Sequence, residues 1–497
     1  MTASEVNWAK LPKKIIKKIG SNIDNAFLLN ARLVNKHWLD SLNELVFSSL
    51  ENWSSDSIPE LVKNHSTCIK SWSSSFRNEE YTQLVTDNVK SLESISWDNG
   101  EEFLGPLNKL IANNPNIKSL SIEIGDYRDQ DEEFADFINL VKSLKHLDTL
   151  KFQTFVPPLL PLVDAIKNMN LKNLSLKGLT NEPQAIWEAY NNSPNLKSFS
   201  LELISDVDIE ARPIRETVIS PNSFEFHPTL EHVNLLASSI MHRKYTYEYY
   251  GKELLLAFEN PKFRNLKSFT WKLDGMVFTD DVISIYKTPV TITSKQCPNL
   301  TFLSLELCDS HLLSLISKQF PNLAQLNLNC PLPLPHPQNN HDSLVHLTKL
   351  AISGYYHEAV RSPSTTQAIF PSVSVLKLQD SRIESNDFNT ELSKISTLFP
   401  SVKHLISYDD HEKWYTLLDT NESYNWEELY IEAKGEDAKK AMKLISKLPN
   451  LKVLYLYNYE NNLKENGFTY NGDACVIRAS GIDDGDYVTE LFQKLNC

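Results

Sequence analysis

The sequence lacks any Cys-x-x-Cys pair, although it contains six cysteines. Zinc ribbons and dithiol redox sites usually carry such pairs, so neither class of site is supported. Long apolar runs are missing too, since no stretch approaches the roughly 18 apolar residues of a membrane span. The first twenty residues also lack the continuous apolar core of a signal peptide. We therefore expect a cytoplasmic or nuclear protein with reduced cysteines and no membrane partner.

Dense basic tracts are absent beyond residues 13–18, and the chain carries a net charge of −14. A surface this acidic repels phosphate backbones, which argues against general binding to nucleic acid. The composition is otherwise that of a globular protein, with 41% hydrophobic and 23% charged residues. Because 497 residues exceed what one compact core usually holds, several domains or one long repeat array are expected.

Recognisable catalytic motifs are also missing. The sequence has no Gly-x-x-x-x-Gly-Lys-Ser/Thr loop, no Gly-x-Gly-x-x-Gly, no His-Glu-x-x-His and no Gly-x-Ser-x-Gly. The histidines between His311 and His357 lack the spacing of metal ligands. The acidic segment 483–486 lacks the rest of a twelve-residue calcium loop, so a solvated turn is expected there. We therefore predict a protein that is not an enzyme, with no catalytic residue, no cofactor and no metal site.

What the sequence does contain is a repeated pattern, Leu-x-x-Leu-x-Leu, in which other large apolar residues can replace leucine. It occurs fourteen times. We call its three apolar positions the first, second and third anchors, and the first anchors run from residue 92 to residue 451. Thirteen intervals therefore cover 359 residues, an average of about 28 residues per repeat. The first anchors are Leu92, Ile117, Leu147, Leu171, Leu196, Leu230, Leu266, Leu300, Leu323, Leu347, Val373, Val402, Trp426 and Leu451.

Proline stands two residues before the first anchor in eight of these copies, from Pro115 to Pro449. Because proline ends a helix and leaves the next segment extended, it marks a junction between helix and strand. In an x-Leu-x-Leu-x strand the two leucines face the core and the x positions face outward. One such unit cannot bury its apolar face alone, so neighbouring units stack into a curved parallel sheet.

This repeat resembles the leucine-rich repeats of F-box and related intracellular proteins over roughly residues 89 to 460. The resemblance implies an α/β fold, a leucine-rich-repeat solenoid whose curved parallel sheet forms a horseshoe. The alternative, unrelated α/β units with leucine-rich strands, is disfavoured because self-similarity at a fixed period is typical of a solenoid. Fourteen strands about 4.8 Å apart would make an arc on the order of 65 Å. That scale suits a folded protein or a long peptide better than a metabolite.

The N-terminal region contains three short amphipathic stretches at helical spacing. They are formed by Ile15, Ile16 and Ile19, by Leu28, Leu29 and Leu33, and by Leu39, Leu42, Leu45 and Val46. A three-helix unit of this size is too small to be very stable alone. The pattern by itself is compatible with an ordinary helical cap on the first repeat.

The same residues resemble an F-box without a gap. The matching positions are Leu11-Pro12, Ile15-Ile16, Ile19, Ile23, Leu28-Leu29, Arg32-Leu33-Val34, Lys36 and Trp38. The sequence departs from the family at four positions: Lys14 stands where an acid is usual, Gly20 for a bulky aromatic, Phe27 for an acid and Asn35 for cysteine.

The resemblance to an F-box implies docking on a Skp-type adaptor, which links to a cullin and a RING subunit. It also implies which residues contribute to adaptor docking or to the helix core behind it: Leu11, Pro12, Ile15, Ile16, Leu29, Val34 and Trp38. We expect an F-box at residues 1–50, a helical or irregular linker at 51–88, about fourteen repeats at 89–460 and a C-terminal cap at 461–497. The Ser/Asn-rich linker is either a rigid connection or a flexible one.

Outward strand positions suggest where a target protein binds. In early copies they are small or polar: Ser94, Ser96, Ser119, Ser121, Ser198 and Ser200. In the last copies they are aromatic or acidic: Tyr408, Tyr430, Tyr455, Tyr457, Glu428 and Glu432. Exposed aromatics are enriched at binding hot spots, so this C-terminal face is the predicted target site. The alternatives are that tyrosine simply suits strands or that residues 461–497 cover this face.

The resemblance therefore implies the substrate-recognition subunit of a Skp–cullin–F-box E3 ubiquitin ligase. The F-box would bind the adaptor, and the repeats would bind an unidentified target protein. Two alternatives remain: a scaffold or interaction protein that binds adaptor without ubiquitination, and a degenerate F-box whose repeats act alone.

Overall fold

The strands form where the apolar repeat places them. A computed structural model describes residues 11–21, 28, 30–50, 57–73, 79–99, 104–124, 131–154, 160–167, 169–179, 190–205, 227–239, 264–273, 287, 289–291, 293, 295–306, 310–329, 344–353, 370–379, 393, 395–407, 424–432, 448, 450–458 and 475–480. The chain divides into two units, Met1–Phe263 and Arg264–Cys497, and each is described by itself.

Within the described residues, the first unit begins with a packed pair of helices, α1 (Lys13–Gly20) and α3 (Lys36–Val46). The helix α3 begins at Asn35, whose side-chain Oδ1 accepts a hydrogen bond from the backbone N–H of Trp38 at 3.0 Å. Asparagine is a favoured residue at this capping position because it satisfies an orphan N–H of the first turn. The departure at Asn35 is therefore compatible with the helix that the F-box resemblance implies.

Two further contacts hold the pair together. The imidazole Nε2 of His37 lies 2.8 Å from the backbone oxygen of Leu11, which joins the starts of the two helices. At the other end of α1, Gly20 is buried, and a Cβ built there would come within 2.7 Å of Leu42 Cδ2. The missing side chain at Gly20 thus allows α1 to approach α3 closely. The departure from the F-box pattern at Gly20 therefore lies in the core of the helix pair, and it removes no apolar area from the surface of the pair.

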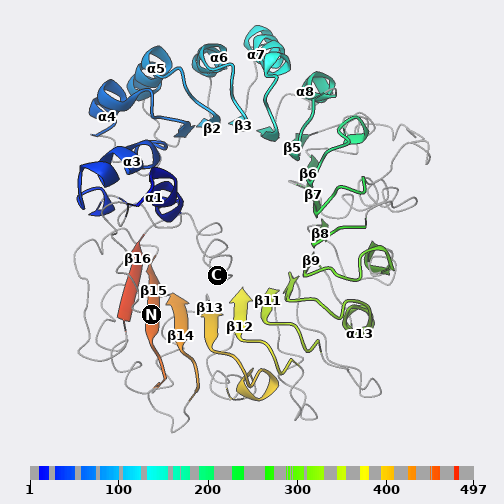
Figure 1. The fold of residues 1–497 in the computed structure, drawn as a ribbon. Coiled ribbons are helices and arrows are strands. Elements are labelled where there is room, and N and C mark those ends of the chain that lie inside the picture. The colour runs from blue at the N-terminus through cyan, green and yellow to red at the C-terminus, as the bar shows by residue number, and fades with distance from the viewer. Residues whose placement is uncertain are drawn as a thin grey trace, which may run out of the picture. The chain divides into compact units, whose positions relative to one another are not determined.

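The rest of the first unit is a parallel sheet with helices along one face (Figure 1). Its strands are β1 (Ser71–Ser73), β2 (Ser94–Asn99), β3 (Ser119–Ile124), β4 (Thr149–Thr154), β5 (Asn173–Leu179), β6 (Ser198–Ser205) and β7 (His232–Ser239), hydrogen-bonded in that order. Its helices are α4 (Ile58–His65), α5 (Glu79–Asn88), α6 (Leu104–Asn113), α7 (Asp131–Ser143) and α8 (Leu160–Ile166), each packed on the next.

The second unit continues the same pattern. Its strands are β8 (Ser268–Leu273), β9 (Phe302–Leu305), β10 (Gln325–Leu328), β11 (Lys349–Ser353), β12 (Val375–Gln379), β13 (His404–Ser407), β14 (Glu428–Glu432), β15 (Val453–Asn458) and β16 (Cys475–Ser480), again parallel and in chain order. Helix α13 (Ser310–Gln319) connects β9 to β10. None of the helices in the described part of the chain is both long and apolar enough to cross a membrane.

The core lies beneath the apolar anchors. Each of the fourteen copies coincides with one of the strands β2 to β15, and neighbouring copies align anchor to anchor, as in Leu120 with Leu150. The second anchors whose burial is described are at most 2% exposed. A parallel sheet with helical crossovers and this repeat is an α/β leucine-rich-repeat solenoid. The fold class predicted from the sequence is confirmed.

Two strands lie outside the predicted repeat region. Strand β1 falls within residues 51–88, where the sequence predicted a linker, and β16 falls within 461–497, where it predicted a cap. Strand β1 pairs in register with β2, so that Trp72 lies beside Ile95. The segment 51–88 therefore carries a repeat unit with two helices and a strand, and the sheet begins before residue 89.

The helix pair is joined to this first strand by backbone bonds. Ser49 forms a parallel bridge with Ser71, and the backbone oxygen of Ser48 accepts hydrogen bonds from Lys70 and Ser71 at 2.8 Å. The chain leaving α3 thus adds directly to the edge of β1. These backbone bonds favour a rigid connection between the helix pair and the first strand.

A stack of side chains covers the same junction. The Phe47 ring lies 3.7 Å from the His65 ring, nearly parallel to it, and the guanidinium of Arg32 lies 4.8 Å above Phe47. Burial lowers the pKa of His65, and the nearby positive charge of Arg32 lowers it further. His65 therefore favours its neutral form, which stacks on Phe47 without a charge facing Arg32.

Candidate functional sites

The first candidate site is an apolar patch at the end of the helix pair where both helices begin. We call it the docking patch and define it as Pro12, Ile15, Leu33 and Val34. Ile15 is 45% exposed, Val34 57% and Leu33 80%. The contact between His37 and the backbone of Leu11 places the residues before α3 beside the start of α1.

Only part of the predicted adaptor set is at the surface. Pro12, Ile15 and Val34 are exposed, and Leu11 is half-buried. Ile16 is fully buried and Trp38 is 8% exposed, so these two form the helix core. The side chain of Leu29 lies outside the described residues. Leu33 was not in the predicted set, although its place beside Val34 in the matching segment was a signal for it.

The docking patch is unusual within the molecule. Single exposed apolar residues are common on soluble proteins and need no explanation. Within the described residues, however, four large apolar side chains are prominently exposed, and three of them lie in this module; the fourth is Val345. Grouped exposed apolar side chains indicate a surface for a partner.

The second candidate site is the outward face of the last strands. Tyr430 lies beside Tyr455, and Glu432 beside Tyr457, because β14 and β15 pair in that register. Tyr408 lies outside the described residues, and the side chains of Tyr430, Glu432, Tyr455 and Tyr457 do as well. The backbone thus brings four of the six predicted target residues together at facing positions on two neighbouring strands.

Glu428, another predicted target residue, has a partner that sequence reasoning missed. Its Oε2 lies 3.0 Å from Nδ1 of His404, and both side chains are about one-fifth exposed. His404 and Glu428 face each other in the register of β13 and β14. The signal was available, because both residues stand directly before the second anchor of their copies.

The early strands of the first unit carry a polar face whose side chains bond to one another. Asn173 Nδ2 donates to Thr149 Oγ1 at 2.9 Å, and Asn234 Nδ2 donates to Ser200 Oγ at 2.9 Å. Lys177 and Glu202 form an ion pair at 3.2 Å. The predicted serines lie in register here, with Ser94 beside Ser119. The side chains named here thus present hydroxyl, amide and charged groups that bond across neighbouring strands.

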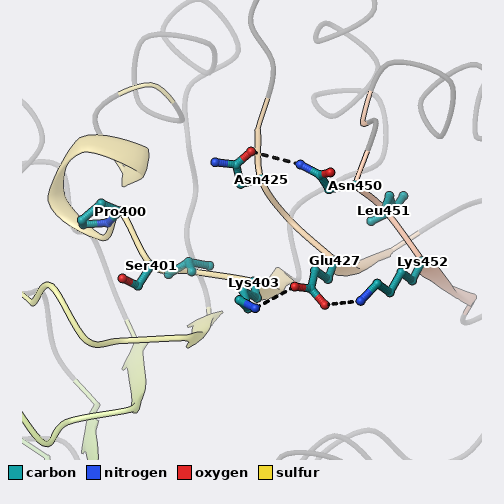
Figure 2. A pocket seen from close by; sticks show the side chains of 9 residues that line it. Pro400, Ser401, Lys403, Asn425, Glu427, Asn450, Leu451 and Lys452 are labelled. Carbon is teal, nitrogen blue, oxygen red and sulfur yellow. Dashed lines mark hydrogen bonds and ion pairs between the residues drawn. The ribbon is translucent and has the colours of Figure 1, made fainter.

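A cavity of about 600 Å³ lies at the starts of β13, β14 and β15. Figure 2 shows Glu427 between Lys403 and Lys452, with Nζ–Oε distances of 2.8 and 2.7 Å. Beside them, Asn450 Nδ2 donates to Asn425 Oδ1 at 3.1 Å. The cavity is therefore lined mainly by exposed polar side chains that already pair with each other.

The same arrangement recurs elsewhere, which indicates a structural role for these groups. In the first unit, Glu93 lies between Lys70 and Lys118, at 3.8 and 2.5 Å. Asparagine pairs also recur at the residue before the first anchor, between Asn195 and Asn170 and between Asn322 and Asn299. These ladders align neighbouring repeats and point to no particular ligand. Among the described residues, no group of three or more side chains could hold a metal ion.

The ladder formed by Lys403, Glu427 and Lys452 predicts the pH at which Glu427 titrates. Hydrogen bonds from Lys403 and then Lys452 lower the pKa of Glu427 to about 2. Because the folded pKa is depressed, the stabilisation is present above the ordinary pKa near 4.5 and is lost as the pH falls towards 2. We expect the carboxyl ¹³C resonance of Glu427, assigned by its loss in Glu427→Gln, to titrate near pH 2. In Lys403→Ala/Lys452→Ala its midpoint should rise towards 4.5, and a midpoint near 4.5 in the unchanged protein would contradict the ladder.

Comparison with known proteins gives limited likenesses. No family model and no curated protein matches the chain. Among solved structures, a chain from the yeast complex of Rad7 and Elc1 is similar at 13% identity, with a TM-score of 0.35, over 94% of this chain and 98% of that one. A protein from Bacteroides fragilis is similar at 13% identity, with a TM-score of 0.29, over 55% of this chain and 76% of that one.

Proposed function

We propose that this chain is the substrate-recognition subunit of a Skp–cullin–F-box ubiquitin ligase, acting in the cytoplasm, the nucleus or both. The N-terminal helices would bind a Skp-type adaptor and, through it, a cullin and a RING subunit. The repeats would bind the target protein. The observation that carries this proposal is the docking patch, because its exposed apolar side chains stand at positions where the sequence resembles an F-box.

The buried residues of the module support the same assignment. Ile16, Trp38 and Leu42 are at most 8% exposed and hold the two helices together. The residues that resemble an F-box are thus divided between a core, which includes Ile16 and Trp38, and a surface, which includes Ile15 and Val34. A simple helical cap would need the core alone and would have no reason to expose the other set.

The connection between module and repeats fits a receptor. A ligase receptor must hold its target at a defined place relative to the adaptor, since the chain itself performs no bond chemistry and contributes through proximity. The bridge between Ser49 and Ser71 and the stack of Phe47 on His65 fix the helix pair to the first strand. The helix pair that would bind the adaptor is therefore held against the first strand of the repeats.

For the target itself, we propose the face formed by Tyr430, Tyr455, Tyr457, Glu428 and Glu432, together with Tyr408. The register of β14 and β15 favours this choice, since it aligns two pairs of these residues. An alternative function is that of an F-box and leucine-rich-repeat scaffold that binds the adaptor without recruiting a cullin. The docking patch is compatible with it, and cullin recruitment separates the two.

The test is Val34→Asp in the full chain, measured as affinity for the Skp-type adaptor of the same organism by calorimetry. A carboxylate placed in an apolar interface loses its hydration without gaining a partner. We therefore expect the Kd for the adaptor to rise at least about 30-fold. Val345→Asp is the matched control, because Val345 is 55% exposed and lies in the second unit. We expect Val345→Asp to bind as the unchanged chain does.

Cullin recruitment is then measured by pulldown of the adaptor complex with a purified cullin. Recovery of the cullin supports the ligase receptor, and binding of the adaptor alone supports the scaffold. Equal affinities for Val34→Asp and Val345→Asp, or no binding by any chain, would remove the docking patch as an adaptor site.

A further inference from the structure

Helix α1 combines an exposed apolar residue with a concentration of positive charge. It contains Lys13, Lys14, Lys17 and Lys18 and no acidic residue. Residues 11–50 carry six basic and three acidic side chains, a net charge of +3, in a chain whose total is −14. The docking patch is therefore bordered by charge of the opposite sign to the rest of the protein.

Within α1 the lysines have different surroundings. Lys17 forms an ion pair with Glu44 of α3, which helps to hold the helix pair. Lys13, Lys14 and Lys18 are exposed. In the helix, Lys18 lies one turn after Ile15 on the same side, and Lys14 lies one turn before Lys18. Lys14 and Lys18 thus stand at the border of the docking patch.

We propose that the docking patch is received by an acidic surface of its adaptor, and that Lys14 and Lys18 steer the two proteins together. This inference rests on the proposed function and specifies the chemistry of the partner surface. An apolar centre with a charged border is the usual arrangement of a protein interface, in which the border governs the rate of association more than the final affinity. Lys14 is also where this chain departs from the F-box pattern, so the charge distinguishes it from chains with an acid there.

A basic helix beside an apolar residue also suits an anionic membrane surface, but the geometry favours a protein. An interfacial helix inserts a continuous apolar face. Here Ile16 and Gly20 are buried against α3, which leaves Ile15 as the exposed apolar residue of a helix only eight residues long. The other patch residues lie in the turn before α3, which suits a shaped partner.

The test measures the association rate of the full chain with the recombinant Skp-type adaptor of the same organism by stopped flow. For the unchanged chain, we expect the rate constant to fall about tenfold between roughly 0.05 and 0.5 M salt, because salt screens the steering charges. In Lys14→Glu/Lys18→Glu it should be lower by at least about tenfold in low salt, with a smaller change in the dissociation rate. Lys14→Arg/Lys18→Arg should restore the rate, and Lys63→Glu, an exposed lysine of α4, is the control that should leave it unchanged.

The outcomes separate this inference from the proposed function. If the adaptor binds, and Lys14→Glu/Lys18→Glu associates as fast as the unchanged chain at every salt concentration, the acidic surface is refuted while the receptor function stands. If the adaptor does not bind the unchanged chain, both fail. Binding of the chain to phosphatidylcholine vesicles containing phosphatidylserine, abolished by the same double substitution, would assign the lysines to a membrane and overturn the proposal.

Discussion

Trp38→Ala is expected to unfold the N-terminal helices and to abolish adaptor binding while the leucine-rich repeats stay folded. The indole is 8% exposed and lies in the core between α1 and α3. Removing a buried tryptophan side chain costs about 3–5 kcal/mol through lost transfer free energy and the cavity left behind. A core of this size seldom supplies more than about 3–5 kcal/mol of stability, so the loss consumes most of it.

The measurement is hydrogen–deuterium exchange of α1 and α3, together with the affinity for the adaptor. Exchange in both helices should approach that of an unfolded segment, and exchange in β3 and β4 should not change. Trp38→Phe keeps a large apolar ring and should retain most of the protection and of the binding. A Trp38→Ala chain with protected helices and full affinity would show that this side chain does not hold the docking patch in place.

The repeat could be predicted from the sequence because its signal is periodic and apolar. Leucine at fixed positions must face the core in every copy, so the fourteen copies determine where the strands β2 to β15 lie along the chain. The proline two residues before eight of the first anchors marks the junction between helix and strand in those copies. No long-range contact has to be inferred, since each unit packs only on its neighbours.

The two strands that the sequence missed have anchors that break this pattern. At β1 the first two anchors are Ile69 and Trp72, but the third position is Ser74. At β16 the register that aligns Val453 with Cys475 puts the third anchor on Arg478. Periodicity therefore fades where the sheet ends.

The candidate sites were predictable to different degrees. The resemblance to an F-box singled out the segment that carries the exposed patch, but it could not divide Ile15 from Ile16. Adjacent residues always face different sides of a helix, and which side is buried is known only once the partner helix is placed. The contact of Glu428 with His404 required the register of two strands, since the two residues are 24 positions apart in sequence. The junction between the helix pair and the sheet could not be predicted. Residues 48–50 bond to β1, and no repeated sequence pattern marks this contact.

Trp72→Ala is expected to detach the helix pair from the sheet without weakening adaptor binding, the reverse of the effect of Trp38→Ala. Trp72 is fully buried in β1, beside Ile95 of β2 and next to Ser71, which bridges to Ser49. Its loss should cost about 3–5 kcal/mol at the point where the module joins the repeats. The docking patch is made by α1 and the turn before α3, so its side chains keep their places.

The measurement is hydrogen–deuterium exchange at residues 48–50 and 70–73, which should rise sharply, together with an adaptor affinity that stays the same. Trp271→Ala is the matched control, because Trp271 is also fully buried but lies in β8 of the second unit. It should cost a similar free energy of unfolding and leave exchange at 48–50 unchanged.

If both substitutions change exchange at residues 48–50 equally, the junction does not depend on Trp72. If only Trp72→Ala raises exchange there, at unchanged adaptor affinity, the attachment of the helix pair to the sheet depends on this side chain and adaptor binding does not.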